Sequence, residues 1–281
     1  FLKDMAWTGF VLAAGMPTLL RADETAAPAA ANLYGADAMP HGWVDDPLVF
    51  VAIAEDGTVT IVCHRSEMGQ GVRTSLPMVV ADELEANWLY VRVEQAPGDE
   101  KKYGNQDTDG SRSMRHFFLP MRRVGAAARQ MLETAAAAHW QVPVQDVSAE
   151  LHRVVHRVSG RVLSYGELAA AAARLPVPSR ESLRLKQPAE FRYIGKGELK
   201  LYDGADIVTG RGLYGIDTRI DGMYYAVVAR PPVFGGKVVR YDASAALKVP
   251  GVVKVVELSG SPSPAEFNPL GGVAVIARHS W

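Results

Sequence analysis

Apolar positions follow two different periods in the first half of the chain. Two strand-like runs, 48–54 and 58–64, flank a short polar turn and predict a β-hairpin. Apolar residues at helical spacing predict a helix over 74–86, with Pro77 in its first turn, and a long helix over about 114–139. Strands and helices therefore share this half of the chain.

Strand patterns dominate the later part of the chain. Residues 150–163 predict strand–turn–strand, and 174–190, with three prolines and several charges, is typical of a domain linker. Further strand-like runs lie at 213–217, 223–230, 237–241, 252–258 and 271–281. We therefore predict an α+β fold, with one domain over 48–185 and a second over 191–281.

The first 47 residues differ in composition and are expected to form an export-signal-like apolar helix and a linker. Residues 5–20 carry no charge; this run suits the apolar part of a signal and is shorter than the roughly 20 residues of a spanning helix. Phe1-Leu2-Lys3 resembles the end of a twin-arginine export signal. We expect a periplasmic protein, associated with the inner membrane through this segment or a partner. An amphipathic helix docked on the protein's own body is the alternative.

Charge and cysteine content narrow the function. Thirty Lys and Arg against 31 Asp and Glu give a net charge of −1, which excludes the broad basic surface typical of nucleic-acid binders. The single cysteine, Cys63, lies in an apolar run and is expected to be a buried, inert thiol. It cannot supply an internal disulfide, a cysteine-rich zinc site or an iron–sulfur cluster. Any such cluster must lie on another chain.

The tripeptide Gly69-Gln70-Gly71 lies between the predicted hairpin and the helix at 74–86. Glycines let backbone amides approach a ligand closely, and the first turn of a helix offers unpaired N–H groups that favour an anion. Gln70 adds donors and acceptors. An anion-binding loop and a tight turn that enters a helix both fit this pattern.

A second glycine-containing stretch, 109–113, precedes the long helix. It closes a polar segment, 96–113, that is too long for a hairpin turn. Its hydroxyls, guanidinium and glycine suit a phosphate or the edge of a pterin, although a helix cap with a solvated arginine also fits. Two such helix starts in one domain favour a dinucleotide-like ligand. Neither has the glycine pattern of a Rossmann site or a P-loop.

The run HRSEMGQGVRTSLPMVVADEL, from His64 to Leu84, resembles the molybdopterin-binding large subunit of the xanthine dehydrogenase/aldehyde oxidase family. The similarity is to its isoquinoline 1-oxidoreductase-like branch, which includes membrane-associated bacterial aldehyde dehydrogenases. Segments 206–217, 230–236 and 249–253 resemble the α/β hammerhead domain that follows part of the cofactor domain in that branch. The resemblance extends from about residue 40 to the end.

By position, the resemblance implies a set of cofactor-binding residues. Those expected to contact the pyranopterin, or to hold the dinucleotide and its phosphates, are Gly69, Gln70, Gly71, Thr74, Gly110, Ser111, Arg112 and Ser113. The implied cofactor is molybdopterin cytosine dinucleotide carrying molybdenum. The family's glutamate base belongs to segments after the hammerhead domain and Glu67 does not match it, so neither a catalytic residue nor a metal ligand is predicted in this segment.

The resemblance also implies a reaction and partners. The expected activity is oxidation of aldehydes to carboxylic acids with water as oxygen source; hydroxylation of N-heterocycles, as in isoquinoline 1-oxidoreductase, is the alternative. Electrons would pass to [2Fe–2S] clusters on a small subunit, then to cytochrome c or quinone, with haem c on a further partner of a heterotrimer. The rest of the large subunit is expected beyond this segment. A noncatalytic assembly or electron-transfer scaffold is the alternative of another class, against which the two anion-competent loops argue.

Overall fold

A three-stranded sheet opens the described part of the chain, which comprises residues 42–265 and 268–280 of this computed structural model. The helix α1 (Pro47–Phe50) leads into β1 (Val51–Ile53), which pairs antiparallel with β2 (Val59–Cys63). Strand β3 (Val91–Gln95) then pairs parallel with β2. The predicted hairpin is confirmed, but its first strand is shorter because the Asp46 side chain caps α1 through the Leu48 N–H.

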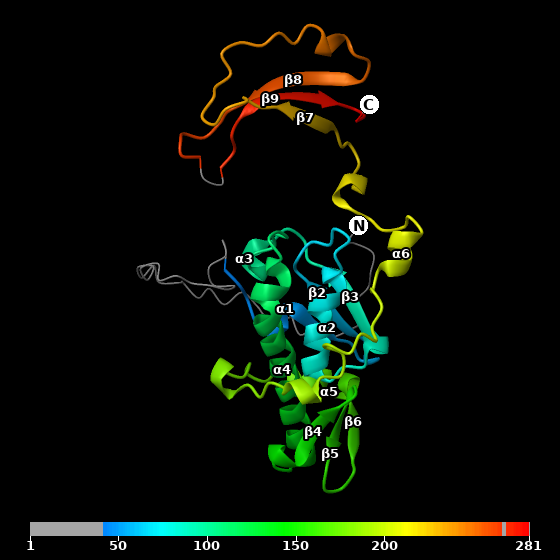
Figure 1. The fold of residues 1–281 in the computed structure, drawn as a ribbon. Helices are drawn as coiled ribbons and strands as arrows, with labels where there is room; N and C mark the ends of the chain where they lie inside the picture. The colour runs from blue at the N-terminus through cyan, green and yellow to red at the C-terminus, as the bar shows by residue number, and fades with distance from the viewer. Residues whose placement is uncertain (1–41, 266–267, 281) are drawn as a thin grey trace. The chain divides into compact units, whose positions relative to one another are not determined.

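Two helices pack against each other beside this sheet: α2 (Val72–Leu84) and α4 (Arg112–Trp140). Figure 1 shows α4 running the length of the first unit, from this sheet to a second one. Helix α2 begins two residues earlier than predicted because Gly71 caps it in the left-handed conformation, so Pro77 lies in the second turn, not the first. Helix α4 confirms the long predicted helix and continues through Pro120.

The second sheet contains the predicted strand–turn–strand and one further strand that precedes it. Strands β4 (Val147–Glu150), β5 (Arg153–His156) and β6 (Val162–Ser164) form an antiparallel sheet in that order. Ser164 and Glu167 then form a reciprocal capping box at the start of α5 (Tyr165–Ala172). The remaining short helices are α3 (Glu100–Tyr103), α6 (Gly204–Val208), and the 3₁₀ turns η2 (Trp88–Tyr90), η3 (Val144–Asp146), η4 (Arg180–Ser182), η5 (Pro188–Glu190), η6 (Gly215–Asp217) and η7 (Ala246–Lys248).

The segment predicted as a linker, 174–190, packs onto the first unit. Buried Asp82 on α2 accepts an ion-pair hydrogen bond from Lys186 Nζ at 2.9 Å. It also accepts backbone N–H groups of the residues 192–194 that follow. The two compact units are accordingly Phe1–Gly212 and Leu213–Trp281, so the boundary lies after the predicted one at 185–191.

The second unit contains one antiparallel sheet in the order β7 (Tyr225–Ala229), β9 (Gly272–Ala277), β8 (Val252–Leu258). The strands predicted at 213–217 and 237–241 are wrong: the first contains the turn η6 and the second has no ladder partner. Among the hydrophobic side chains described in this unit, Ala274 alone is buried.

The export-signal expectation falls on residues 1–41, which lie outside the described residues. In the described ranges, no helix has the length and apolarity to cross a membrane.

We predict that Gly125→Ala destabilises the first unit. A Cβ at Gly125 would lie 2.4 Å from the Val80 carbonyl oxygen, where α4 crosses α2. Alanine alone would raise helix stability by about 1 kcal/mol, whereas overpacking of this kind costs roughly 1–3 kcal/mol. The expected net result is a lower free energy of unfolding in urea titrations.

The matched control is Gly98→Ala, because a Cβ at Gly98 meets no atom within 4 Å. This control should leave the unfolding midpoint nearly unchanged. An unchanged or raised midpoint for Gly125→Ala would show that the two helices can separate without cost.

Candidate functional site

The two predicted loops meet at one cavity of about 370 Å³ in the first unit. Residues from the loop between β2 and α2 and from α2 form one wall, and residues preceding and opening α4 form the other. The lining residues are Met68, Gln70, Val72, Ser75, Thr108, Asp109, Gly110, Ser111, Ser113 and Met114. The structure thus brings together loops that are about forty residues apart in sequence, with hydroxyl, amide and backbone groups facing the same space.

The Glu67 carboxylate organises the first loop. Its Oε1 accepts the N–H groups of Gly69 at 2.7 Å and Gly71 at 2.9 Å, and its Oε2 accepts that of Arg73 at 2.9 Å. Partial burial raises the pKa of Glu67, but these N–H donors outweigh burial and hold the pKa below its usual range. The sequence predicted that the first turn of α2 offers unpaired N–H groups to an anion; instead this chain's own carboxylate occupies them.

Gln70 lines the cavity while bracing its own loop. Its Oε1 accepts the Met68 N–H at 2.6 Å, and its Nε2 donates to the Ser66 carbonyl at 2.9 Å. An amide has two donor hydrogens and two acceptor lone pairs, so one of each remains for a ligand. Thr74 lies elsewhere: it is buried, its hydroxyl accepts the Tyr202 N–H at 2.8 Å, and Ser75 takes the place on the cavity wall.

The second loop turns into α4 through two left-handed residues, Gly110 (φ 49°) and Ser111 (φ 57°). Ser111 caps α4 without a side-chain hydrogen bond to the helix. Arg112 forms an ion pair with Asp109 and is not part of the cavity wall. The Ser113 hydroxyl lines the cavity and accepts a hydrogen bond from Arg65 Nε at 3.1 Å.

Three buried residues at the end of β2 lie behind the first loop. Cys63 is fully buried, and burial raises the pKa of its thiol to about 12, which agrees with an inert thiol. His64 contacts the rings of Phe50 and Phe117. Burial, followed by the charge of Arg65, lowers the pKa of His64 to about 3, so the imidazole is neutral.

The sequence did not identify Arg65 or Ser75 as site residues, because only the folded chain places them at the loops.

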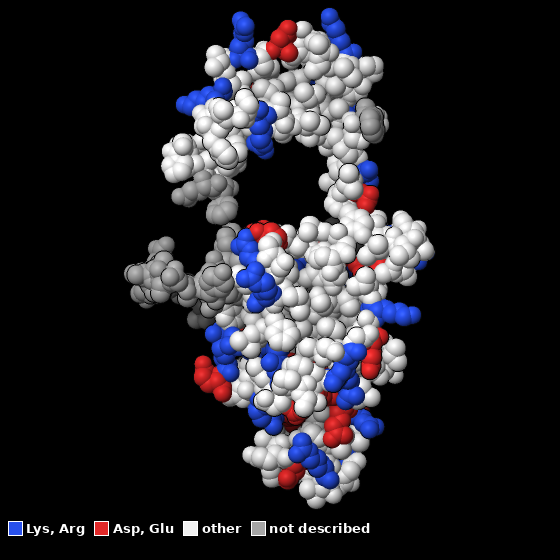
Figure 2. Space-filling view, in the orientation of Figure 1, with Lys and Arg blue, Asp and Glu red and all other residues white. Residues whose placement is uncertain are grey.

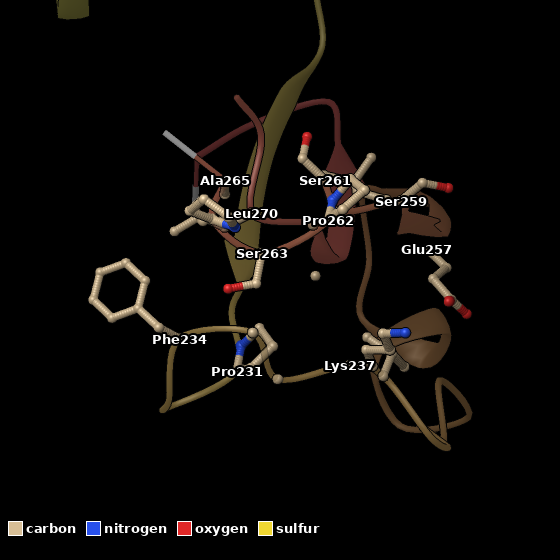
Figure 3. A pocket seen from close by; sticks show the side chains of 18 residues that line it. Pro231, Phe234, Lys237, Glu257, Ser259, Ser261, Pro262, Ser263, Ala265 and Leu270 are labelled. Carbon is tan, nitrogen blue, oxygen red and sulfur yellow. The ribbon is translucent and has the colours of Figure 1, made fainter. Parts of the chain in front are cut away.

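A larger cavity of about 740 Å³ lies in the second unit, between the loops that join its strands. Figure 3 shows it lined by proline, serine and glycine segments, with Lys237 and Glu257 as its ionisable side chains. None of the residues expected to bind the cofactor lines it. The smaller cavity is the better site because it combines two helix starts and several hydroxyls, one of which, on Ser113, is bound by the buried Arg65 behind it.

Charged side chains of both signs are mixed on the surface of the first unit. On the face in Figure 2, Lys and Arg alternate with Asp and Glu over the first unit without a continuous basic surface. On this face the balanced composition corresponds to charges of mixed sign.

Residues 29–201, more than half of the chain, match the molybdopterin cofactor-binding domain family. The chain belongs to this family, within the xanthine dehydrogenase/aldehyde oxidase group. It is 34% identical to the beta chain of isoquinoline 1-oxidoreductase from Brevundimonas diminuta, over 96% of this chain and 38% of that protein. It is 33% identical to a membrane-bound aldehyde dehydrogenase [pyrroloquinoline-quinone] of Gluconacetobacter polyoxogenes, over 82% and 30%.

Other relatives are more distant. A nicotinate dehydrogenase subunit of Pseudomonas putida is 29% identical, over 74% of this chain and 18% of that protein. Two solved structures are similar: Cu,Mo-CO dehydrogenase (TM-score 0.36, 25% identity, 43% of this chain and 15% of that chain) and quinoline 2-oxidoreductase from Pseudomonas putida 86 (0.37, 21%, 45% and 16%). The chain spans well under half the length of these relatives.

The cavity fits part of a molybdopterin-type cofactor. Gln70 offers amide groups to a pterin edge, and two serines with the start of α4 offer donors to phosphate oxygens. Arg65 adds a buried donor, Nη2, that lacks a hydrogen-bond partner in the described structure. A group that brings acceptor oxygens to this place would complete the hydrogen bonding.

We predict that Glu67→Gln loosens the first loop. An amide nitrogen in place of one carboxylate oxygen faces an N–H donor, so the free energy of unfolding should fall by about 1–3 kcal/mol. Because the folded pKa is lowered, the stabilisation by Glu67 is complete above the unfolded pKa and is lost as pH falls through the folded pKa. The variant should therefore show a weaker loss of stability in acid, measured by urea unfolding between neutral and acidic pH.

Glu94→Gln is the control, since the Glu94 carboxylate is partly exposed and lies 3.9 Å from Arg92. Such exposed pairs contribute about 0–1 kcal/mol. Equal effects of the two substitutions would contradict the role assigned to Glu67.

Proposed function

We propose that this chain is part of the large subunit of a molybdenum hydroxylase and that its cavity of about 370 Å³ holds the pterin edge and the phosphates of molybdopterin cytosine dinucleotide. The observation that carries the proposal is the meeting of the two loops, 67–71 and 108–114, in a chain whose family binds molybdopterin. When bound, the cofactor supplies two-electron oxidation of the substrate carbon.

Each group of residues has a separate role in this proposal. Gln70 contacts the pterin through its remaining amide donor and acceptor. Gly69 and Gly71 keep the loop backbone close to the ligand, held by Glu67. Gly110, Ser111 and Ser113 receive the phosphates at the start of α4, while the ion pair with Arg112 offsets the charge of Asp109, which also lines the cavity. Thr74 acts indirectly, by fixing α2 against Tyr202.

Aldehyde oxidation to carboxylic acids is the favoured reaction. The relative from Gluconacetobacter polyoxogenes is named a membrane-bound aldehyde dehydrogenase, and the uncharged run at 5–20 suits a protein exported to the periplasmic side of the inner membrane. Hydroxylation of N-heterocycles is the second candidate, since relatives are named for isoquinoline and nicotinate. The active assembly would add the rest of the large subunit, a small [2Fe–2S] subunit and a cytochrome c or quinone acceptor.

We propose that the second unit is a hammerhead-like domain. Its sheet of β7, β9 and β8 lies in the part of the chain whose motifs resemble that domain. Most of its hydrophobic side chains are exposed or half-buried, as expected for a domain whose faces pack against further parts of an assembly.

Oxygen labelling of the native assembly tests the proposed reaction. Aldehydes and N-heterocycles are supplied with an artificial electron acceptor in water enriched in ¹⁸O. The expected product is a carboxylic acid that carries one solvent-derived oxygen. A labelled hydroxy-heterocycle without acid formation would select the second candidate, and the absence of both products would contradict the proposed enzyme.

A substitution at Gln70 tests the site itself. We expect Gln70→Ala to lower the pterin content of the purified protein several-fold because it removes the amide from the cavity wall. Gln106→Ala is matched: Gln106 also braces a loop, by bonds to Asp99, His64 and Pro97, but does not line the cavity. It should retain pterin. Equal retention by both variants would support the scaffold alternative.

A further inference from the structure

Arg65 is a fully buried cation. Its side chain is 0% exposed, and within the described ranges no carboxylate forms a salt bridge with it. Its Nη1 donates to both oxygens of Asn105, its Nε donates to Ser113 Oγ, and the Phe117 ring covers its face with Cζ 4.8 Å from the ring centroid. Buried charges are normally paired with an opposite charge because desolvation is costly.

The unpaired donor lies on the side of the guanidinium that faces Ser113. Nη2 has no hydrogen-bond partner among the described residues, although it is buried. In a planar guanidinium, one N–H of Nη2 is parallel to the Nε–H, and together they form the fork that receives two oxygens of one anion. Nε already donates to Ser113 Oγ at 3.1 Å, and Ser113 lines the cavity. The open half of the fork is therefore beside the start of α4.

The described charged groups around Arg65 are arginines and aspartates. Asp107 and Asp109 act on Arg65 from a distance, but burial outweighs them and lowers the pKa of the guanidinium. Asp109 is paired with Arg112, and Arg115 donates to the Gly110 carbonyl at 3.3 Å. Among these described residues, three arginines face two carboxylates at the positive end of a 29-residue helix.

We propose that Arg65 is a phosphate-binding residue of this site, whose Nη2 donates to a pyrophosphate oxygen while its Nε keeps its hydrogen bond to Ser113. This inference rests on the proposed function, and it adds a residue outside the two loops. It assigns an anion to the second loop: Glu67 binds the N–H groups of Gly71 and Arg73 at the start of α2, whereas in the described structure the N-cap side chain of α4 makes no capping hydrogen bond.

The test uses the complete protein as its host produces it, in native and cofactor-free forms, with inorganic pyrophosphate as probe. The variants are Arg65→Met, which removes the charge, and Arg65→Lys, which keeps the charge but loses the fork. Pyrophosphate affinity is obtained from the concentration-dependent rise in the thermal unfolding midpoint, against chloride at equal ionic strength. Pterin released from the native form is measured per protein.

We expect pyrophosphate to stabilise the unsubstituted protein, Arg65→Met to weaken its binding about tenfold or more, and Arg65→Lys to weaken it several-fold. Pterin content should fall in the same order. Arg92→Met is the control, because Arg92 is an exposed arginine on β3 outside the cavity wall; it should match the unsubstituted protein.

Unchanged pyrophosphate affinity in Arg65→Met would overturn the inference and assign Arg65 to structure alone. Should Arg65→Met fail to fold, Arg65→Lys decides: affinity equal to that of the unsubstituted protein would overturn the inference. An unsubstituted native protein without pterin would instead contradict the proposed function, while its response to pyrophosphate would still test Arg65.

Discussion

The close crossing of α2 and α4 is the contact on which the site depends. Gly125 lets α4 approach the Val80 carbonyl of α2, and Glu83 reinforces the crossing by ion pairs with Arg122 and Arg129 on α4. Both helices begin at the cavity and run away from it. Their fixed crossing therefore sets the spacing between the two loops, and any shift of one helix would move one wall of the cavity.

The two helix starts both follow glycine-containing loops, but they differ in whether a carboxylate of the chain binds their N–H groups. The Glu67 carboxylate binds the N–H groups of Gly71 and Arg73 at the start of α2, and that of Gly69 before it, and so shapes the glycine loop. Among the described residues, no carboxylate caps the start of α4 in this way, and Arg65 behind it forms no salt bridge. A rigid, neutral loop beside a positive one is suited to a ligand with a polar ring system at one end and phosphates at the other.

Local sequence rules predicted much of the first unit. The hairpin and the long helix follow from short-range periodicity, and the structure contains them, although a kink or a helix start was expected at Pro120 and the helix continues through it. The two loops were recognised as candidate sites because glycines and polar groups precede helices. Their meeting at one cavity could not be predicted from spacing, since it results from the packing of α2 on α4. Thr74 and Ser75 illustrate the limit: adjacent positions on one helix face different surroundings.

Predictions failed where long-range contacts decide the outcome. The 174–190 segment has the composition of a linker, yet buried Asp82 holds it to α2 through Lys186. The apparent strands at 213–217 and 237–241 have apolar residues but lack a neighbouring strand, so they form no ladder. Glu67 and Arg65 acquire their roles only because the folded loops bring backbone N–H groups to one and Ser113 to the other.

The central claim is that this fold holds a molybdenum-bearing pterin at the meeting point of the two loops. Elemental mass spectrometry of the native assembly, against protein concentration, tests it most directly. We predict about one molybdenum and four irons per copy of this chain, the irons belonging to two [2Fe–2S] clusters on a partner. A full-length, folded sample with neither metal would contradict the claim and show that the family fold serves another purpose here.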